Sequence, residues 1–475
     1  MNSYMNKWAT LGLILLLSAC KSISISTDKP LKEMPPDFEA YADTTNIANL
    51  SWREYFGDTT LVRLIEQAIT DNPDLSIAQQ RIEMARADVT FTKGMLLPVV
   101  DAAGFAGQAR TAEFSVNWAG NEGGQFLSGD PLRPAYTDYF IGLQSSWEAD
   151  VWGKLKNRKK AALSRFYASS EGKNWVVSNL VADMALTYYE LLSLDENLEI
   201  IRETIALQEN ALEVVRAQKE AGKANKLAVE QFETQLLSLK GLEKETLQEI
   251  AVVEYRLNLL MGHYPKAIQR NSFAFEDSVA LSVLPGVSSQ LLVNRPDIRQ
   301  AELDLMATKA DVKAARAAFY PSLGITAGFG YNAFKPQFLF RSPESIAYNV
   351  FGDLTAPLFN RSAIKAEFNF NKANQVEAFY NYQKTLLEAY SEVSLEIRNI
   401  RNLQERYELK SNEVDVLTSS IETSSDLFKT GRASYLEVLI TQQNTLQSRL
   451  ELIDVREQLY YSKVKLYKAL GGGWR

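Results

Sequence analysis

The sequence contains little of the chemistry on which enzymes and metal sites depend. Its 475 residues include one cysteine, Cys20, and one histidine, His263. A single cysteine excludes an internal disulfide framework and a cysteine zinc site, and a single histidine leaves no Ser/His/Asp or Cys/His arrangement. We therefore expect no catalytic residues and no metal site.

Two further absences narrow the class of protein. The net charge is −7 and 23% of the residues are charged, so the chain has no basic surface for nucleic acid. Beyond residue 19, no apolar run approaches the roughly 18 residues that a helical membrane span requires.

The first 19 residues have the features of a secretory signal peptide, with Lys7 followed by the apolar run LGLILLLSA. The run stops at Cys20, and LSAC resembles a bacterial lipobox. The resemblance implies cleavage before Cys20 and a covalent lipid there in place of any other cofactor; an uncleaved anchor is the alternative. Lys21, where some lipoproteins have Asp, implies sorting to the outer membrane. Residues 20–60 would then form a lipidated N-terminal strap, polar and proline-containing as far as Asn49.

The rest of the chain is a duplication. NPDLSIAQQRI begins at residue 72 and RPDIRQAEL begins 223 residues later, and EAGKA (220–224) matches KTGRA (429–433) at an offset of 209. We assign a first repeat to 61–262, an equatorial linker to 263–286, a second repeat to 287–471 and a short tail to 472–475.

Each repeat has the same order of predicted elements: a helix ending at a proline, two extended segments, a very long helix, a glycine turn and a return helix. In the long helix, apolar residues recur at steps of three, four or seven from Val177 to Val215. This heptad pattern is typical of coiled coils. The helices are expected at about 61–97, 153–221 and 225–261, and again at about 287–320, 361–430 and 434–470.

The extended segments alternate between apolar and polar residues, which is the pattern of membrane barrel strands. In YFIGLQSSWEADVW one face carries Tyr139, Ile141, Leu143 and Trp147. Hairpins are expected at about 99–150 and 322–358. Polar positions of the other face are predicted to line a barrel lumen: Gln144, Glu148, Asp150, Asn349 and Asp353.

Four strands per chain cannot close a barrel, because an open sheet edge is not tolerated in lipid. Copies of the chain must share strands. Two copies would give eight strands and an interior filled by side chains, and three would give twelve strands and a lumen. Strand counting alone leaves dimer and trimer open.

Nearly the whole chain resembles the TolC-like outer membrane factors, in particular the lipoprotein branch that works with RND efflux pumps (the OprM/NodT type). The resemblance is carried by NPDLSIAQQRIEMARAD, NRPDIRQAELDLMATKADVKAARAAFYPSL, PLFNRSAIKAE and KTGRASYLEVLITQQNTL. It implies an α+β membrane protein: a homotrimer with a twelve-stranded β-barrel on a long antiparallel α-helical coiled-coil tunnel, each chain internally duplicated.

The resemblance also implies the function and the partners. The protein would be the exit duct of a tripartite efflux pump, lipid-anchored in the outer membrane of a Gram-negative bacterium and extending into the periplasm. A periplasmic membrane-fusion adaptor and an inner-membrane RND pump would be its partners, and small molecules its cargo. No enzymatic activity and no nucleic acid are implied.

The same resemblance places the gate at the periplasmic ends of the helices. The adaptor-contacting tip turns would contain Gly222 and Lys223 in the first repeat and Gly431 and Arg432 in the second. Arg432, Tyr435 and Glu437 are the candidates for gating and selectivity. Related chains often carry Asp in LLDAQ, whereas this chain has Ile440, so a second acidic ring is not implied.

Two alternative functions stay open from the sequence. One is an exit duct for type I protein secretion, which shares the scaffold. The other is a non-conducting lipidated coiled coil that tethers the outer membrane in the periplasm, although such a spacer would not need four alternating strands.

Overall fold

The computed structural model describes residues 35, 50–115, 118, 124–270, 292, 294–359 and 361–475. The predicted signal peptide, Cys20, nearly all of the strap before Leu50 and most of the predicted linker lie outside these residues. None of the described helices is long and apolar enough to cross a membrane.

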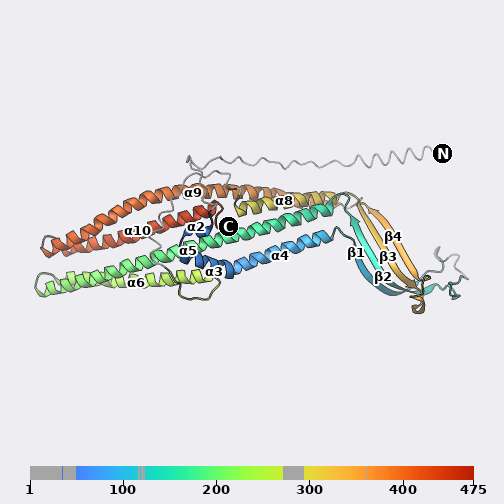
Figure 1. Cartoon of the computed structure of the whole chain (residues 1–475), viewed down its shortest axis with the longest axis horizontal. Helices are drawn as coiled ribbons and strands as arrows, with labels where there is room; N and C mark the ends of the chain where they lie inside the picture. The colour runs from blue at the N-terminus through green and yellow to red at the C-terminus, as the bar shows by residue number, and fades with distance from the viewer. Residues whose placement is uncertain are drawn as a thin grey trace. The chain divides into compact units, whose positions relative to one another are not determined.

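Four antiparallel strands form one sheet in the order β1-β2-β3-β4 (Figure 1). The strands are β1 Val99–Arg110, β2 Ala135–Ala149, β3 Ser322–Ala333 and β4 Ile346–Thr355. Each hairpin thus comes from one repeat, and β2 pairs with β3 across the repeats. The outer edges of β1 and β4 are not paired with any strand of the described chain.

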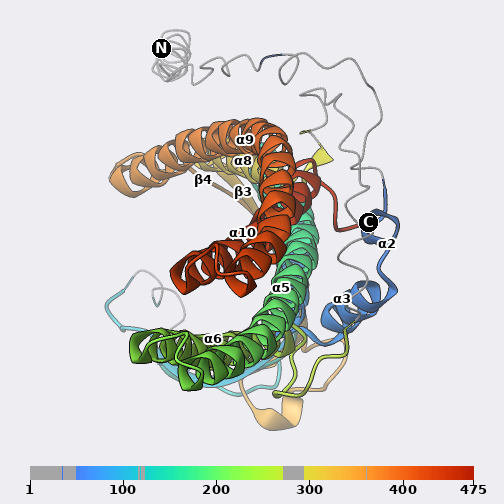
Figure 2. The same ribbon diagram turned by 90° about the vertical axis from the view of Figure 1, so that its left-hand side faces the viewer.

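Two long antiparallel helical hairpins make up most of the remaining structure, as the heptad pattern predicts (Figure 1). The first joins α5 Lys154–Glu220 to α6 Lys226–Leu260, and the second joins α9 Ser362–Lys429 to α10 Tyr435–Ala469. Figure 2, which looks along the helices, shows them arranged in a curved layer. The apolar stripe of α5 is buried or half-buried from Val177 to Val215.

The first helix of each repeat is shorter than predicted. In place of one helix over about 61–97, the chain forms α3 Thr59–Asp71 and α4 Pro73–Gly94. Pro73 excludes the helical conformation at the preceding residue, and Asn72 is extended (φ −64°, ψ 126°). Its side-chain Oδ1 accepts the backbone N–H groups of Asp74 and Leu75, at 2.8 and 3.1 Å, so it caps α4.

The second repeat has its counterpart in α8 Pro296–Ala317, where the proline again occupies the first turn. Arg295 precedes it with an extended conformation (φ −68°, ψ 132°) but makes no side-chain cap. Instead its guanidinium is buried, with 1% of the residue exposed. It bonds Asp297, Glu392 and the carbonyl of Ala469, the last at 2.9 Å.

The end of the predicted strap differs from a polar surface segment. Ser51 caps a short helix, α2 Trp52–Phe56, through a capping box with Glu54. Trp52, Tyr55 and Phe56 are buried because the helix packs against the main layer. The ring of Tyr55 stacks on Tyr467 at 4.0 Å, and its hydroxyl donates to the carbonyl of Lys463 at 2.9 Å.

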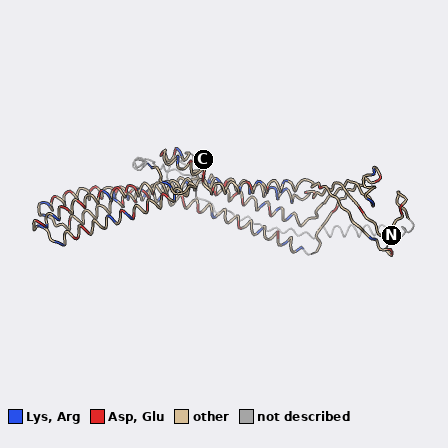
Figure 3. The backbone as a smooth tube through the Cα atoms, turned by 90° about the horizontal axis from the view of Figure 1, so that it is seen from below, with Lys and Arg blue, Asp and Glu red and all other residues tan. Residues whose placement is uncertain are grey.

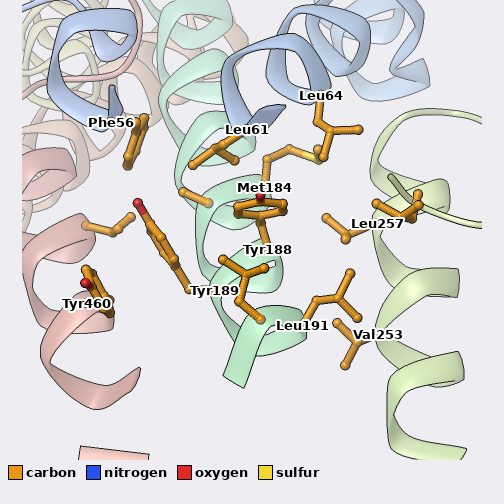
Figure 4. Close-up of a cluster of buried hydrophobic side chains, with 14 of the residues drawn as sticks. Phe56, Leu61, Leu64, Met184, Tyr188, Tyr189, Leu191, Val253, Leu257 and Tyr460 are labelled. Carbon is orange, nitrogen blue, oxygen red and sulfur yellow. The ribbon is translucent and has the colours of Figure 1, made fainter. Parts of the chain in front are cut away.

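The main core lies where α2 and α3 cover the middle of α5 (Figure 4). Met184, Tyr188 and Leu191 of α5 are each fully buried. Burial of one such apolar side chain contributes about 1.5–3 kcal/mol. Figure 4 shows them near Leu61, Leu64, Val253 and Leu257 of α3 and α6, while Tyr189 of α5 lies near Phe56 of α2 and Tyr460 of α10.

Residues after α10 dock on the same region. Gly472 packs so closely on Tyr467 that an added Cβ would lie 2.5 Å from the ring. Its carbonyl accepts the Ser178 hydroxyl at 2.9 Å. Gly471 has a positive φ of 91° and lies against the backbone and Cγ of Arg295, so the residues after α10 pack on this buried arginine.

Candidate functional site

The sheet has one polar face, and four of the five predicted lumen residues lie on it. Gln144 is opposite Asp101 on β1 and Gly328 on β3, and Gly328 is opposite Asn349 on β4. Glu148, Gly324 and Asp353 form the same kind of row nearer the helices. Opposite residues in antiparallel strands point to the same face, so these polar side chains share one surface. A hollow of about 490 Å³ on it includes Asp101, Gln144 and Asn349.

The other face of the sheet is apolar, exposed on β1, β2 and β4 at most positions and half-buried along much of β3. It is formed by the alternate positions of all four strands, among them Val100, Ile141, Leu143, Ile325, Phe329, Tyr348, Val350 and Leu354. The strands carry few charges compared with the helices (Figure 3). This division is the one expected of a sheet with lipid on one side and water on the other.

On the polar face of the sheet, two glycines leave room for an aromatic ring. Gly142 and Gly330 are opposite each other, and the ring of Phe140 lies over both of them. An added Cβ at Gly142 would lie 2.6 Å from the Cα of Gly330 and 2.9 Å from the ring. Phe140 also stacks on Phe105 at 5.5 Å, so an aromatic pair stands beside the hollow.

Asp150 differs from the other predicted lumen residues because β2 ends at Ala149. Its two carboxylate oxygens accept the backbone N–H groups of Leu155 and Lys156 at 2.9 and 2.8 Å. Asp150 therefore caps the N-terminus of α5, where a negative charge also meets the positive end of the helix dipole. Glu148 accepts from Lys154 at 2.7 Å, so both acids serve the junction between strand and helix.

The two predicted tip turns have closely similar conformations. Gly222 and Gly431 have φ values of +71° and +74°, which only glycine adopts without strain. The next residues, Lys223 and Arg432, donate their backbone N–H groups back to Gln218 and Leu427, both at 2.8 Å. These bonds complete the same helix-terminating motif at both tips. The side chains of Lys223 and Arg432 are exposed.

The three gate candidates have different surroundings. Arg432 has no ion pair with any residue that the structure describes. Tyr435 is half-buried against a cluster that joins both tips and includes Leu212, Val215 and Phe232. Glu437 forms a capping box with Ser434, accepting its backbone N–H at 2.6 Å and its hydroxyl at 3.0 Å. These two bonds hold the pKa of Glu437 below its usual value.

A polar seam between α5 and α10 was not found from the sequence. Ser193 donates to Glu457 at 2.5 Å, and Arg449 pairs with Glu203 at 3.0 Å. Between them, Arg456 pairs with Glu196. The seam links the α5–α6 hairpin to the α9–α10 hairpin, farther from the tip turns than the cluster around Phe232. Heptad counting identifies apolar contacts and does not specify which polar residues of another repeat face them.

The described residues include no group of three or more His, Cys, Asp or Glu side chains that could hold a metal ion. His263 lies 3.3 Å from Asp71, at the end of the first hairpin.

The amino-acid sequence is similar to those of known outer membrane efflux proteins over most of its length. Residues 64–263 and 287–472 both match the family model for outer membrane efflux proteins. The chain is 28% identical to SilC of Salmonella typhimurium, over 98% of this chain and 99% of SilC. It is equally 28% identical to the cation efflux system protein CusC of Escherichia coli K12, over 97% of each chain.

Solved structures show the same fold. A crystal structure of CusC superposes with a TM-score of 0.82 at 28% identity, covering 95% of this chain and all of that one. The open MtrE channel of Neisseria gonorrhoeae gives a TM-score of 0.83 at 22% identity, over 95% and 98%.

The chain belongs to the outer membrane efflux protein family. Within it, the protein is a non-enzymatic channel of an efflux system, with a TolC-like fold of four strands, long helices and two repeats. It lies in the outer membrane and extends into the periplasm. These findings confirm the fold class and the efflux function that the sequence predicts.

Proposed function

We propose that three copies of the chain share one twelve-stranded barrel and together form the conducting pore. The observation that carries this proposal is the four-stranded sheet with one apolar face, one polar face and two open edges. Open edges are costly in lipid, and twelve strands leave a water-filled lumen whereas eight do not.

A second feature supports the assembly. Leu395, Leu409 and Val416 of α9 are 62%, 73% and 66% exposed and lie at multiples of seven residues. Exposed apolar residues at this spacing form a coiled-coil stripe that lacks its partner helix. A neighbouring copy supplies that helix in the proposed trimer.

The test is the native mass of the detergent-extracted protein, with any acyl chains retained. A three-chain species is expected, each chain carrying lipid at Cys20, the attachment site implied by LSAC. A monomer that persists on dilution would leave four strands with no way to close, and would refute the shared barrel.

The channel is gated at the two tip turns, which a periplasmic adaptor engages on behalf of an inner-membrane RND pump. Arg432 supports this role because its exposed cation has no ion pair with a described residue. Tyr435 supports it because its ring packs on the cluster that joins the two tips. Glu437 adds a negative charge in the same first turn of α10.

Conductance in planar bilayers tests the gate. The Arg432→Ala and Tyr435→Ala variants should conduct more than the unmodified channel when no partner is present. Lys429→Ala is the matched control, because Lys429 pairs within its own helix with Asp426. Equal conductance in all three variants and the unmodified protein would remove Arg432 and Tyr435 from the gate.

The cargo is a class of small molecules rather than one compound. CusC is named for cation efflux, while OpmQ of Pseudomonas aeruginosa, 28% identical over 99% of this chain, is named for pyoverdine export. Asp101 and Asp353 give the polar face of the sheet a negative charge, which favours cations entering the lumen.

A further inference from the structure

Two exposed stripes run along α5 and α8 close to the sheet. Their members recur every three or four residues, which places them on one side of each helix. On α5 the exposed residues are Lys156, Lys160, Leu163 and Tyr167, and the exposed Trp152 lies just before the helix. On α8 they are Met306, Lys309, Lys313 and Arg316, and the exposed Tyr320 lies just after the helix.

The two stripes meet at an aromatic pair at the end of the sheet. Trp152 follows β2 and Tyr320 precedes β3, and their rings stack with centroids 5.0 Å apart. The indole Nε1 of Trp152 donates to the carbonyl of Pro321 at 2.7 Å, which fixes the pair. The helices themselves are closely packed through Ala161, Ala307 and Ala310.

The cations of these stripes are not used inside the chain. We call Lys156, Lys160, Lys309, Lys313 and Arg316 the basic collar. None of the five forms an ion pair with any residue in the described part of the chain. Cations on the other sides of α5 do pair, since Lys154, Arg158 and Arg165 bond Glu148, Glu367 and Asp311.

The basic collar on α5 lies away from the polar face of the sheet. Lys154 bonds Glu148 of that face, and Lys156 and Lys160 point from the opposite side of the helix. Arg165 turns toward Asp311 of α8, and Phe166 contacts Arg86 of α4, so the collar positions on α5 face elsewhere. β2 and β3 are the central strands. Copies that joined at the edges β1 and β4 would therefore leave the collar accessible.

We propose that the basic collar binds the headgroups of anionic phospholipids on the periplasmic side of the outer membrane. Lys156 and Arg316 lie near the sheet ends of α5 and α8, each four residues along the chain from one ring of the Trp152–Tyr320 pair. Aromatic rings are enriched at membrane interfaces, and nearby lysines and arginines attract anionic lipid. The long basic side chains reach the phosphate layer while their stems cover apolar surface.

The proposal depends on the outer membrane position of the protein and not on its gate or its cargo. The anionic cell wall is the other surface that a basic patch in the periplasm could meet. The structure favours lipid, because the collar lies at the sheet ends of α5 and α8, and the sheet has an exposed apolar face that includes Leu143 and Phe329.

Native mass spectrometry of the full detergent-solubilised protein tests the proposal. The lipids are phosphatidylglycerol and, for comparison, phosphatidylethanolamine, titrated at low and at high salt. The test variant combines Lys156→Gln, Lys160→Gln, Lys313→Gln and Arg316→Gln. The control removes four cations near the tips instead: Lys219→Gln, Lys223→Gln, Lys226→Gln and Arg432→Gln. A third variant keeps the charge, with Lys156→Arg, Lys160→Arg, Lys313→Arg and Arg316→Lys.

The unmodified protein should retain phosphatidylglycerol preferentially, and high salt should weaken the preference. The glutamine variant should lose about tenfold or more of it, while the tip control and the charge-preserving variant keep it. Equal retention in the glutamine variant, or equal loss for both lipids, would overturn the proposal. So would binding to isolated cell-wall sacculi that requires the collar while lipid retention does not change.

Discussion

Asn72 and Arg295 occupy equivalent positions in the two repeats and donate to equivalent carbonyls, those of Leu260 and Ala469, at 2.8 and 2.9 Å. Each bond ties the start of a short helix to the last turn of a return helix. The two residues do so by different means. Asn72 also caps α4, whereas Arg295 cannot accept a hydrogen bond and is instead neutralised by Asp297 and Glu392.

Arg295→Ala should be among the most destabilising substitutions in the region where α8, α9 and α10 meet. Burial alone lowers the pKa of Arg295, but its bonds to Asp297 and the charge of Glu392 outweigh that effect and raise it. Removing one partner of a buried ion pair costs about 3–5 kcal/mol. Thermal unfolding checks this, with Arg299→Ala as control because Arg299 is exposed and pairs within one helix turn with Glu302. Similar unfolding temperatures in the two variants would show that the buried ion pairs of Arg295 do not stabilise the fold.

Two substitutions distinguish the effect of the negative charge of Glu437 from the effect of its helix cap. In Glu437→Gln the amide oxygen still accepts from Ser434, whereas Ser434→Ala weakens the cap and leaves the charge. If the charge gates the channel, bilayer conductance and cation selectivity should change only in Glu437→Gln. A change confined to Ser434→Ala would show that the capping of α10, rather than a ring of carboxylates, sets the closed tip.

The contribution of Glu457 to the stability of the folded state should become more favourable as the pH falls. Burial raises its pKa above the usual 4.5, although the hydrogen bonds from Ser193 and Tyr461 oppose the shift and the charges of Glu190 and Asp454 add to it. The folded state therefore penalises the ionised form. Glu457→Gln should raise the unfolding temperature at pH 7, and the gain should disappear as the pH falls toward 4.5.

The matched control for Glu457 is Glu451 on the same helix. Hydrogen bonds from Lys410 and Gln447 lower its pKa, so its ionised form stabilises the fold above the usual value of 4.5. Glu451→Gln should therefore lower the unfolding temperature at pH 7, and the loss should shrink as the pH falls through the folded-state pKa. Shifts of the same sign in both variants would show that the charge of the carboxyl is not the cause.

Gly142→Ala should disrupt the pairing of β2 with β3. The new methyl group would lie 2.6 Å from the Cα of Gly330, and overpacking of this kind costs about 1–3 kcal/mol. Gly107→Ala is the control, since it lies on the same face of the same hairpin with nothing within 4 Å of the new Cβ. The fraction of folded, membrane-extracted protein should fall only for Gly142→Ala, and an equal yield would argue against close strand contact there.

The sequence predicts the strands and long helices well because both have short periods that a single chain displays. Alternation from Tyr139 to Trp147 separates the two faces of β2, and the stripe from Val177 to Val215 defines the buried side of α5. Both signals are local and depend only on burial of one face.

Features that depend on distant partners were missed. Pro73 fits either the end or the first turn of a helix, and only the bond from Asn72 to Leu260 selects the break. A buried Arg295 is favourable because Asp297 and the distant Glu392 together neutralise it. Asp150 follows the alternation of β2 in the sequence, yet the start of α5 recruits its carboxylate as a cap.

The docking of Gly472 on Tyr467 and Ser178 has a consequence for the order of biogenesis. Tyr55 and Leu50 bond Lys463 and Tyr467, so residues made early meet residues made more than four hundred positions later. A chain delivered to the periplasm from its N-terminus can form its first hairpin during export. The contacts of Gly472 with Ser178 and Tyr467 cannot form until residue 472 has arrived. Truncated products would thus leave Arg295 exposed, and periplasmic proteases could recognise them before they reach the outer membrane.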